Sequence, residues 1–183
     1  MRPARAAERA AAGELTAAAY VADGLLGPTD PYLAELTDAA GRAEAPHTEL
    51  LVAVTGPEVG PAVLGTVTFV RPGSPYAEIS RPGEAEFRML AVDPDARGRG
   101  LGELLVRACV ERATRAGDRW LVLSTHPRMA AAHRLYRRLG FTRLPERDWT
   151  PVPGVDLLAY RLALGPGASG ACGASGASGA SGG

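Results

Sequence analysis

The pattern of hydrophobic and polar positions changes its period about half-way along this chain. Apolar residues alternate or run together in ELLVAVTG, PAVLGTVTFV and EAEFRMLAV, which predicts three strands of an antiparallel meander. After these strands, the pattern predicts a helix over Leu101–Ala116, a strand at RWLVLST, a helix at PRMAAAHRLYRRLG, and strands near FTRL and VDLLAYRLAL. We therefore expect an α/β (α+β) fold in which helices cover a mixed sheet.

The ends of the chain differ from this central part. AERAAAGELTAAAYVADGLL and DPYLAELTDAAGRA predict two helices before the meander, the second ending at Gly41 or Pro46, and GPEVGP predicts a hairpin loop. Residues 165–183 repeat Gly, Ala and Ser and have no large apolar side chain, so ordering them would not be offset by burial. We expect one domain at residues 1–164 and a disordered tail at residues 165–183.

Composition excludes several classes of function. The 183 residues carry no net charge and only 5% aromatic residues, so a nucleic-acid partner is not expected. No apolar run is long enough to span a membrane, and the N-terminus lacks the apolar segment of a signal peptide, which favours a cytoplasmic protein. The chain has no lysine, which excludes a Schiff base and a P-loop. Its two cysteines, Cys109 and Cys172, lie far apart and indicate no metal site.

The segment AVDPDARGRGLGELLVRACVERA places three glycines and two arginines where a helix begins. Leucines at the i, i+3, i+4 spacing fix the helix, so its first turn coincides with Gly100–Gly102. A glycine costs about 1 kcal/mol in a helix relative to alanine. The glycines therefore indicate that free amides of the first turn are used to bind an anion, and Arg97 and Arg99 would add positive charge. The alternative is that the glycines serve only a tight turn. The residues that follow, Glu103 and Leu105, exclude the Rossmann fingerprint.

Two motifs resemble those of a known family. Arg97-x-x-Gly100-x-Gly102, after LAVDPDA, resembles the Arg/Gln-x-x-Gly-x-Gly/Ala coenzyme A motif of the Gcn5-related N-acetyltransferases (GNAT). AAAHRLYRRLGF, at the spacing the family shows, is similar to its second acetyl-CoA motif. The resemblance covers residues 2–164. It implies the GNAT fold, with a sheet of about 6–7 strands, about four helices, and an opening in the sheet at the acetyl-CoA site.

The resemblance implies that acetyl-CoA is the co-substrate. The pantetheine arm would pair with the backbone of Leu90, Ala91 and Val92, and a backbone N–H there would stabilise the oxyanion. The pyrophosphate would be held by Arg97, Gly98, Arg99, Gly100, Leu101 and Gly102. One departure stands out, because Met129 occupies the position at which many relatives have an asparagine that holds pantetheine.

The resemblance also implies the catalytic residues. Glu86 lies where many members place a carboxylate that acts as a base through water, and Glu84 shares its strand face. His126, which ends the next strand, is an alternative base or the start of a helix. Tyr136 falls on the inward stripe of its helix and matches the family's proton donor to the coenzyme A thiolate, although a core tyrosine explains the same spacing. His133 is expected on the helix surface.

We therefore expect an acetyl-CoA-dependent N-acetyltransferase that acts on an amine, with a small molecule favoured over a protein N-terminus or lysine. Acidic residues in the variable segments would attract a cationic amine, and Tyr76 and Trp149 are candidates to line its pocket. The acidic residues are Asp30, Glu78, Glu84, Glu146 and Asp148. The alternatives are a non-catalytic acyl-CoA-binding domain, which Met129 favours, and an interaction module. The resemblance allows a homodimer but identifies no interface.

Overall fold

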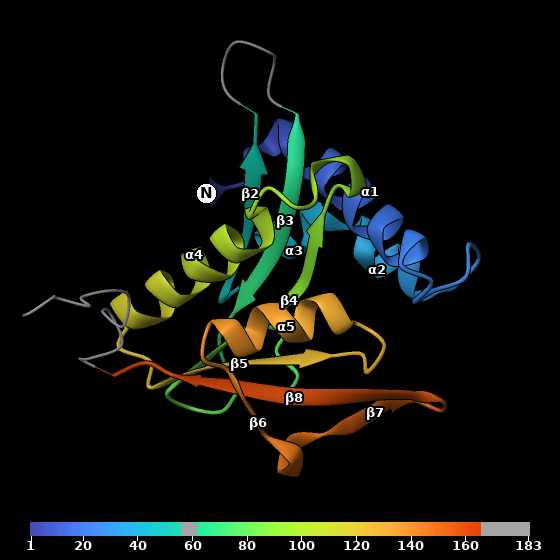
Figure 1. Ribbon diagram of the computed structural model, residues 1–183. Coiled ribbons are helices and arrows are strands. Elements are labelled where there is room, and N and C mark those ends of the chain that lie inside the picture. Colours follow the sequence, from blue (N-terminus) through green and yellow to red (C-terminus); the bar gives the residue numbers. More distant parts are fainter. Residues whose placement is uncertain (56–61, 166–183) are drawn as a thin grey trace, which may run out of the picture.

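One mixed sheet organises the molecule, and the computed structural model describes residues 1–55 and 62–165 (Figure 1). The strand order is β1-β2-β3-β4-β5-β8-β6, with β7 paired to β8, and only β4 and β5 run parallel. This confirms the predicted fold class, with eight strands in the described part of the chain. The strands are β1 (Arg2–Pro3), β2 (Thr48–Val54), β3 (Val63–Val70), β4 (Glu84–Val92), β5 (Trp120–Thr125), β6 (Thr142–Arg143), β7 (Trp149–Val152) and β8 (Val155–Ala163).

The described residues form five α-helices, which are α1 (Ala6–Ala22), α2 (Tyr32–Thr37), α3 (Ala39–Glu44), α4 (Leu101–Arg115) and α5 (Ala130–Arg138). Short 3₁₀ turns add η2 (Pro94–Ala96) and η3 (Pro145–Arg147). The single helix expected over DPYLAELTDAAGRA is wrong, because the chain breaks at Asp38 and the Asp38 carboxylate caps α3 by accepting the Gly41 N–H at 2.8 Å. Gly41 lies inside α3, which ends before Pro46.

Helices cover both faces of β2–β4. On one face, α4 packs on Leu51, Ala53, Phe69 and Phe87, and on the other, α1 and α3 pack on Leu50 and Val52. In Figure 1, β2–β4 run roughly vertically, whereas β5 and β8 run roughly horizontally and are covered by α5. Burial on two faces explains why the meander strands read as apolar runs.

The N-terminal strand is tied to the first helix by Glu8. Its side chain is 5% exposed, accepts the Arg5 N–H at 2.8 Å, and forms an ion pair with Arg2. The Arg2 hydrogen bond holds the pKa of Glu8 well below its ordinary value, at about 2. The link therefore stabilises the start of α1 electrostatically.

Two sequence predictions lie outside the described residues. These are the hairpin loop at residues 56–61 and the tail, of which only residue 165 is described. Among the helices that the structure describes, none has both the length and the apolar composition needed to cross a bilayer.

The sheet opens between its two parallel strands. Pairing of β4 with β5 is confined to Glu84–Glu86 opposite Trp120–Val122, after which β5 continues against β8. A β-bulge follows on β4, because Thr68 pairs with Arg88 and Thr66 with Ala91, and Met89 has a φ of 52°. The rest of β4 thus turns an edge toward the opening, as the GNAT resemblance implied.

Candidate active site

The turn from β4 into α4 adopts a conformation that glycine favours. Gly98 and Gly100 both have a φ of 77°, and Gly100 is the N-cap of α4. A Cβ atom at either position would meet no atom within 4 Å, so the space next to the turn is open. The first intrahelical hydrogen bond of α4 runs from the Leu104 N–H to the Gly100 carbonyl. The N–H groups of Leu101–Glu103 therefore have no acceptor within the helix. The turn can therefore present these amides to an anion.

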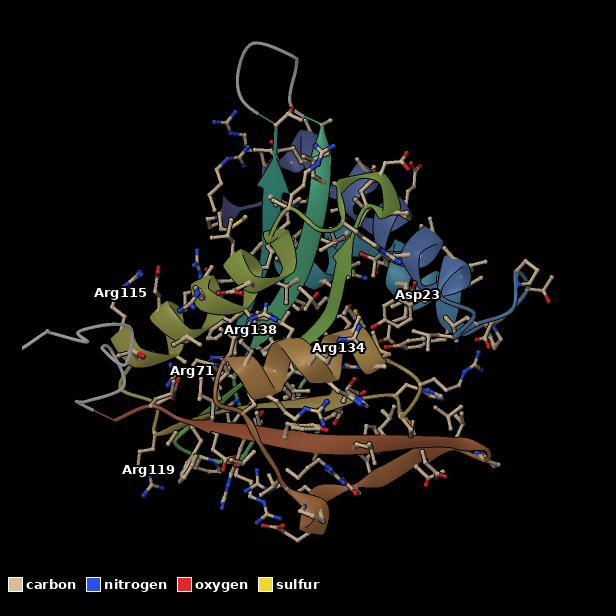
Figure 2. All side chains as sticks on the ribbon, viewed as in Figure 1. Asp23, Arg71, Arg115, Arg119, Arg134 and Arg138 are labelled. Carbon is tan, nitrogen blue, oxygen red and sulfur yellow. The ribbon has the colours of Figure 1, made fainter. Side chains whose placement is uncertain are left out.

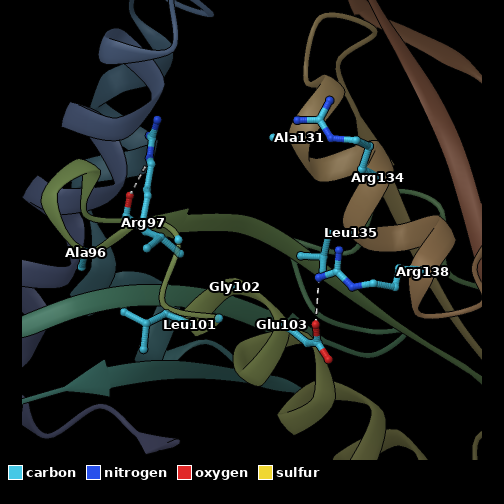
Figure 3. Close-up of a pocket in the computed structure, with 12 residues that line it drawn as sticks. Ala96, Arg97, Leu101, Gly102, Glu103, Ala131, Arg134, Leu135 and Arg138 are labelled. Atoms are coloured by element: carbon cyan, nitrogen blue, oxygen red, sulfur yellow. Dashed lines mark hydrogen bonds and ion pairs between the residues drawn. The ribbon is translucent and has the colours of Figure 1, made fainter. Parts of the chain in front are cut away.

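A cleft of about 340 Å³ lies over this turn, between the start of α4 and α5 (Figure 3). Val92, Ala131 and Leu135 give it apolar walls. Gly98, Gly100, Leu101 and Gly102 form its turn side, and Arg97, Arg134 and Arg138 supply positive charge. Arg99 is exposed next to the cleft and is not among its lining residues.

Carboxylates hold two of the three arginines that line the cleft. Arg97 Nη1 lies 2.8 Å from Asp23 Oδ1 at the end of α1, and Arg138 Nη2 lies 2.8 Å from Glu103 Oε2 on α4. Arg107 also binds Glu103, and the hydrogen bonds from Arg138 and Arg107 lower the pKa of this carboxyl. Figure 2 shows Arg134 and Arg138 on α5 and Asp23 at the end of α1. The charges around the cleft thus come from several elements.

A second, small cavity of about 20 Å³ lies where β4 and β5 separate. It is formed by residues of α1, β4, β5 and α5 that are far apart in the sequence. Its lining comprises Tyr20, Phe87, Arg88, Met89, Leu90, Ser124, Thr125, Met129 and Tyr136. Val92 lines the large cleft and Leu90 lines this cavity, so the open edge of β4 connects the two.

Tyr136 forms part of the wall of the small cavity and is otherwise buried, with 3% of its surface exposed. Its ring contacts Phe87 edge-on at 5.8 Å between centroids and also lies against Phe141 and Tyr160. Burial raises the pKa of the phenol, so the hydroxyl keeps its proton at neutral pH. A protonated hydroxyl at this position can donate to a developing anion.

A family model described as the acetyltransferase (GNAT) family matches residues 17–141, which is more than half of the chain. The chain belongs to the GNAT family of acetyltransferases. The matched segment includes the glycine turn, the open edge of β4 and Tyr136.

Relatives in sequence match parts of the chain. A mycothiol acetyltransferase from Acidothermus cellulolyticus is 40% identical over 91 residues, covering 46% of this chain and 27% of that protein. An uncharacterised N-acetyltransferase from Schizosaccharomyces pombe is 35% identical over 74 residues, covering 40% of this chain and 45% of that protein. The chain thus spans less than half the length of these relatives.

Solved structures match most of the chain. A GNAT-family acetyltransferase from Staphylococcus aureus has a TM-score of 0.70 at 13% identity, covering 90% of this chain and 98% of that one. The yncA protein of Salmonella typhimurium, solved with its cofactor acetyl-CoA, has a TM-score of 0.61 at 24% identity, covering 93% of this chain and 97% of that one. These structures share the GNAT fold.

In this GNAT domain, Glu86 lies on the face of β4 opposite α4 and is fully buried. Its Oε2 accepts the N–H groups of Glu78, Ile79 and Ser80 at 3.0–3.1 Å, while Oε1 has no partner among the described residues. Burial raises the pKa of Glu86. Burial also acts to raise the pKa of Glu84, but the hydrogen bonds from Arg147 and from the Arg81 N–H outweigh it and lower the pKa.

Of the other candidate residues of this GNAT domain, only Met129 lines one of the two cavities. Met129 lines the small cavity, and its sulfur lies 3.6 Å from Thr125 Oγ1. His126 lines neither cavity, and its Nδ1 accepts the Arg128 N–H at 3.2 Å. His133 packs against Tyr160 at 5.7 Å. Trp149 donates its indole N–H to Ser124 at 3.1 Å.

Two residues that line the small cavity were not predicted from the sequence. Tyr20 reaches the small cavity from α1, where an alanine-rich sequence gave no signal for it. Arg88 lines the same cavity from β4. The single charge inside the apolar run FRMLAV was a signal for Arg88, because a charged side chain is rarely buried unless it is paired.

Proposed function

We propose that the protein transfers the acetyl group of acetyl-CoA to the nitrogen of a primary amine. The observation that carries this proposal is the continuity of the site along β4. A basic cleft over free helix amides leads along an open strand edge to a cavity walled by Tyr136. Membership of the family and the acetyltransferase names of the relatives support it.

The large cleft suits the pyrophosphate of the co-substrate. A diphosphate needs backbone donors and cations, and the turn offers three amides at the positive end of a 15-residue helix beside three arginines. The residues that would hold it are Arg97, Gly98, Arg99, Gly100, Leu101 and Gly102, of which Arg99 would act from outside the cleft.

The open edge of β4 suits the pantetheine arm, which carries amides that can pair like a strand. Leu90, Ala91 and Val92 follow the bulge and have no partner on β5, so their free backbone groups would pair with the arm. The bulge at Met89 leaves a β4 amide outside the regular ladder, where it can stabilise the oxyanion of the tetrahedral intermediate.

The chemical step needs a neutral amine. Its nitrogen attacks the thioester carbonyl carbon, the C–S bond breaks, and the thiolate takes a proton from the hydroxyl of Tyr136, which recovers one released by the nitrogen. Glu86 is the base favoured by the family resemblance. Its buried Oε1, which has no partner in the described part of the chain, could receive through a water molecule the extra proton that the ammonium form of the amine loses before the neutral nitrogen attacks.

The acceptor that we propose is a small molecule. Relatives are named mycothiol acetyltransferase and N-acetylaspartate synthetase, the latter from Danio rerio and 37% identical over 38% of this chain and 25% of that protein. A protein acceptor is the alternative. A non-catalytic acyl-CoA-binding domain is a second candidate, favoured by Met129 in the position of the family's asparagine.

The experiment is a turnover assay with the full chain, acetyl-CoA and a panel of primary amines, in which thioester loss and acetylated product are both measured. Tyr136→Phe should lower kcat about 100-fold without changing acetyl-CoA affinity. Tyr160→Phe, which alters a neighbouring ring outside the cavity, should leave kcat unchanged. Binding of acetyl-CoA without turnover of any amine would favour the non-catalytic domain.

A further inference from the structure

A layer of charged and phenolic side chains covers the face of β4 that turns away from α4. Arg88 lies at its centre, with its side chain 10% exposed. It donates from Nη1 to the Tyr76 carbonyl at 2.9 Å and from Nη2 to the Tyr32 hydroxyl at 3.1 Å. Glu78, on the connection from β3 to β4, forms an ion pair with Nη2, and Glu35 on α2 lies 3.8 Å from Nη1. The layer therefore brings α2 and the connection together over the opening of the sheet.

The glutamates of this layer differ in how many hydrogen-bond partners their carboxylate oxygens already have. Glu84 is fixed by both ends of the Arg147 guanidinium and by the Arg81 N–H. Glu86 is fully buried and accepts three backbone N–H groups. Glu78 has a side chain that is 20% exposed, and Arg88 is the partner that its carboxylate binds. Of these three carboxylates, Glu78 is thus the one that solvent and a substrate can reach.

Glu78 also lies close to the reaction centre. Its partner Arg88 lines the small cavity together with Met89 and Tyr136, so one side chain separates the Glu78 carboxylate from that cavity. Burial raises the pKa of Glu78 to about 7, with Glu86 and Glu35 acting in the same direction and Arg88 in the opposite one. A carboxyl that titrates near neutral pH can both accept and release a proton at that pH.

We propose that Glu78 binds the ammonium group of the acceptor and accepts its first proton, an inference that rests on the proposed function. The ammonium gives one proton to the carboxylate, and the neutral nitrogen then forms the bond to the thioester carbon. The second proton leaves the nitrogen when the C–S bond breaks and balances the proton that Tyr136 gives to the thiolate. Glu78 passes its proton to solvent through its exposed edge.

Arg88 and Glu86 are positioning residues in this scheme. Arg88 holds the Glu78 carboxylate, and Glu86 Oε2 fixes the backbone of Glu78 through its N–H at 3.1 Å. The negative charges of Glu78 and Glu35 thereby favour an acceptor that arrives as a cation. Proton transfer to Glu86 through water is the competing outcome.

The test is a pH profile of kcat/KM for the full chain, with acetyl-CoA and the best acceptor among an amino acid, an amino sugar, spermidine and a short peptide. The unchanged protein should lose activity as the pH falls through about 7. Glu78→Gln should lower kcat/KM about 100-fold and remove this limb of the profile, and Glu78→Asp should restore both in part. Acetyl-CoA affinity should stay the same in both variants.

Two further variants separate the outcomes. Glu35→Gln removes a negative neighbour that raises the pKa of Glu78, so it should move the limb to lower pH. Glu86→Gln should keep the limb. A Glu78→Gln variant with unchanged kcat/KM and profile, or a limb lost only in Glu86→Gln, overturns the assignment while leaving the proposed function standing. Failure of the unchanged protein to acetylate any amine, although it binds acetyl-CoA, overturns both.

Discussion

Arg138 on α5 and Glu103 on α4 join the two sides of the cleft, with Nη2 and Oε2 2.8 Å apart (Figure 3). Both residues line the cleft, and Glu103 also belongs to the first turn of α4, whose amides face the same space. A carboxylate therefore occupies the position of an anion beside the proposed pyrophosphate site. A phosphate that enters must compete with Glu103 for Arg138.

Glu103→Gln should therefore tighten acetyl-CoA binding. Removing the carboxylate frees Arg138 and Arg107 and removes repulsion of the phosphates, and we expect a Kd roughly 2- to 5-fold lower at low salt, as for exposed charges. Calorimetric titration measures the change. Glu111→Gln makes the same charge change at the far end of α4 and should leave the Kd unchanged. Equal or weaker binding by Glu103→Gln would show that the carboxylate does not compete with the ligand.

Gly100→Asp should abolish acetyl-CoA binding, whereas Gly100→Asn should retain much of it. The two side chains have nearly the same shape, and both tolerate the left-handed conformation that Gly100 adopts, so the pair isolates the effect of charge. The aspartate would place a negative charge over the free amides of the helix. Thermal unfolding checks that both variants fold, and titration measures affinity. Equal affinities would place the phosphates elsewhere.

Met129→Asn should strengthen acetyl-CoA binding by about 3- to 10-fold, the value of one added hydrogen bond. Met129 lines the cavity at the thioester end of the site and offers only a weak sulfur acceptor, which lies against Thr125 Oγ1. Met129→Leu, which has a similar volume and no polar group, is the control and should bind as the unchanged protein does. No gain for the asparagine would mean that pantetheine finds its partners on the β4 backbone alone.

Glu8→Gln should lower the free energy of unfolding at about pH 7 by about 2 kcal/mol, because it breaks a charged hydrogen bond at the start of α1. The pKa of Glu8 is lowered in the folded state to about 2. The stabilisation is therefore complete above the unfolded value near 4.5 and is lost as the pH falls toward 2. Urea titrations at several pH values should show the variant and the unchanged protein converging in acid. Glu14→Gln on the same helix should have little effect.

Much of the architecture, and the glycine turn before α4, could be predicted from the sequence. Apolar periodicity located the meander and α4 to within a few residues, since strands buried on two faces and an amphipathic helix leave strong patterns. The glycines of the turn could be read because a positive φ at Gly98 and Gly100 restricts the residue type.

The bulge of β4 and the surroundings of its glutamates could not be predicted in the same way. The bulge at Met89 places a methionine at a positive φ, which no local sequence signal marks. The burial of Glu86 depends on three amides from the β3–β4 connection, whose path is set by tertiary packing. Strand alternation placed Glu84 and Glu86 on one face correctly, but it could not show which oxygens were already bonded.

The short contact between β4 and β5 has a consequence for the mechanics of the domain. Three residue pairs join the two halves of the sheet, and the remaining length of both strands diverges. A ligand that pairs with β4 beyond Glu86 would act as an inserted strand and would connect the two halves of the sheet. Amide hydrogen exchange of residues 87–92 would then slow when the ligand binds, and the protein would resist unfolding as a single unit only while its co-substrate is in place.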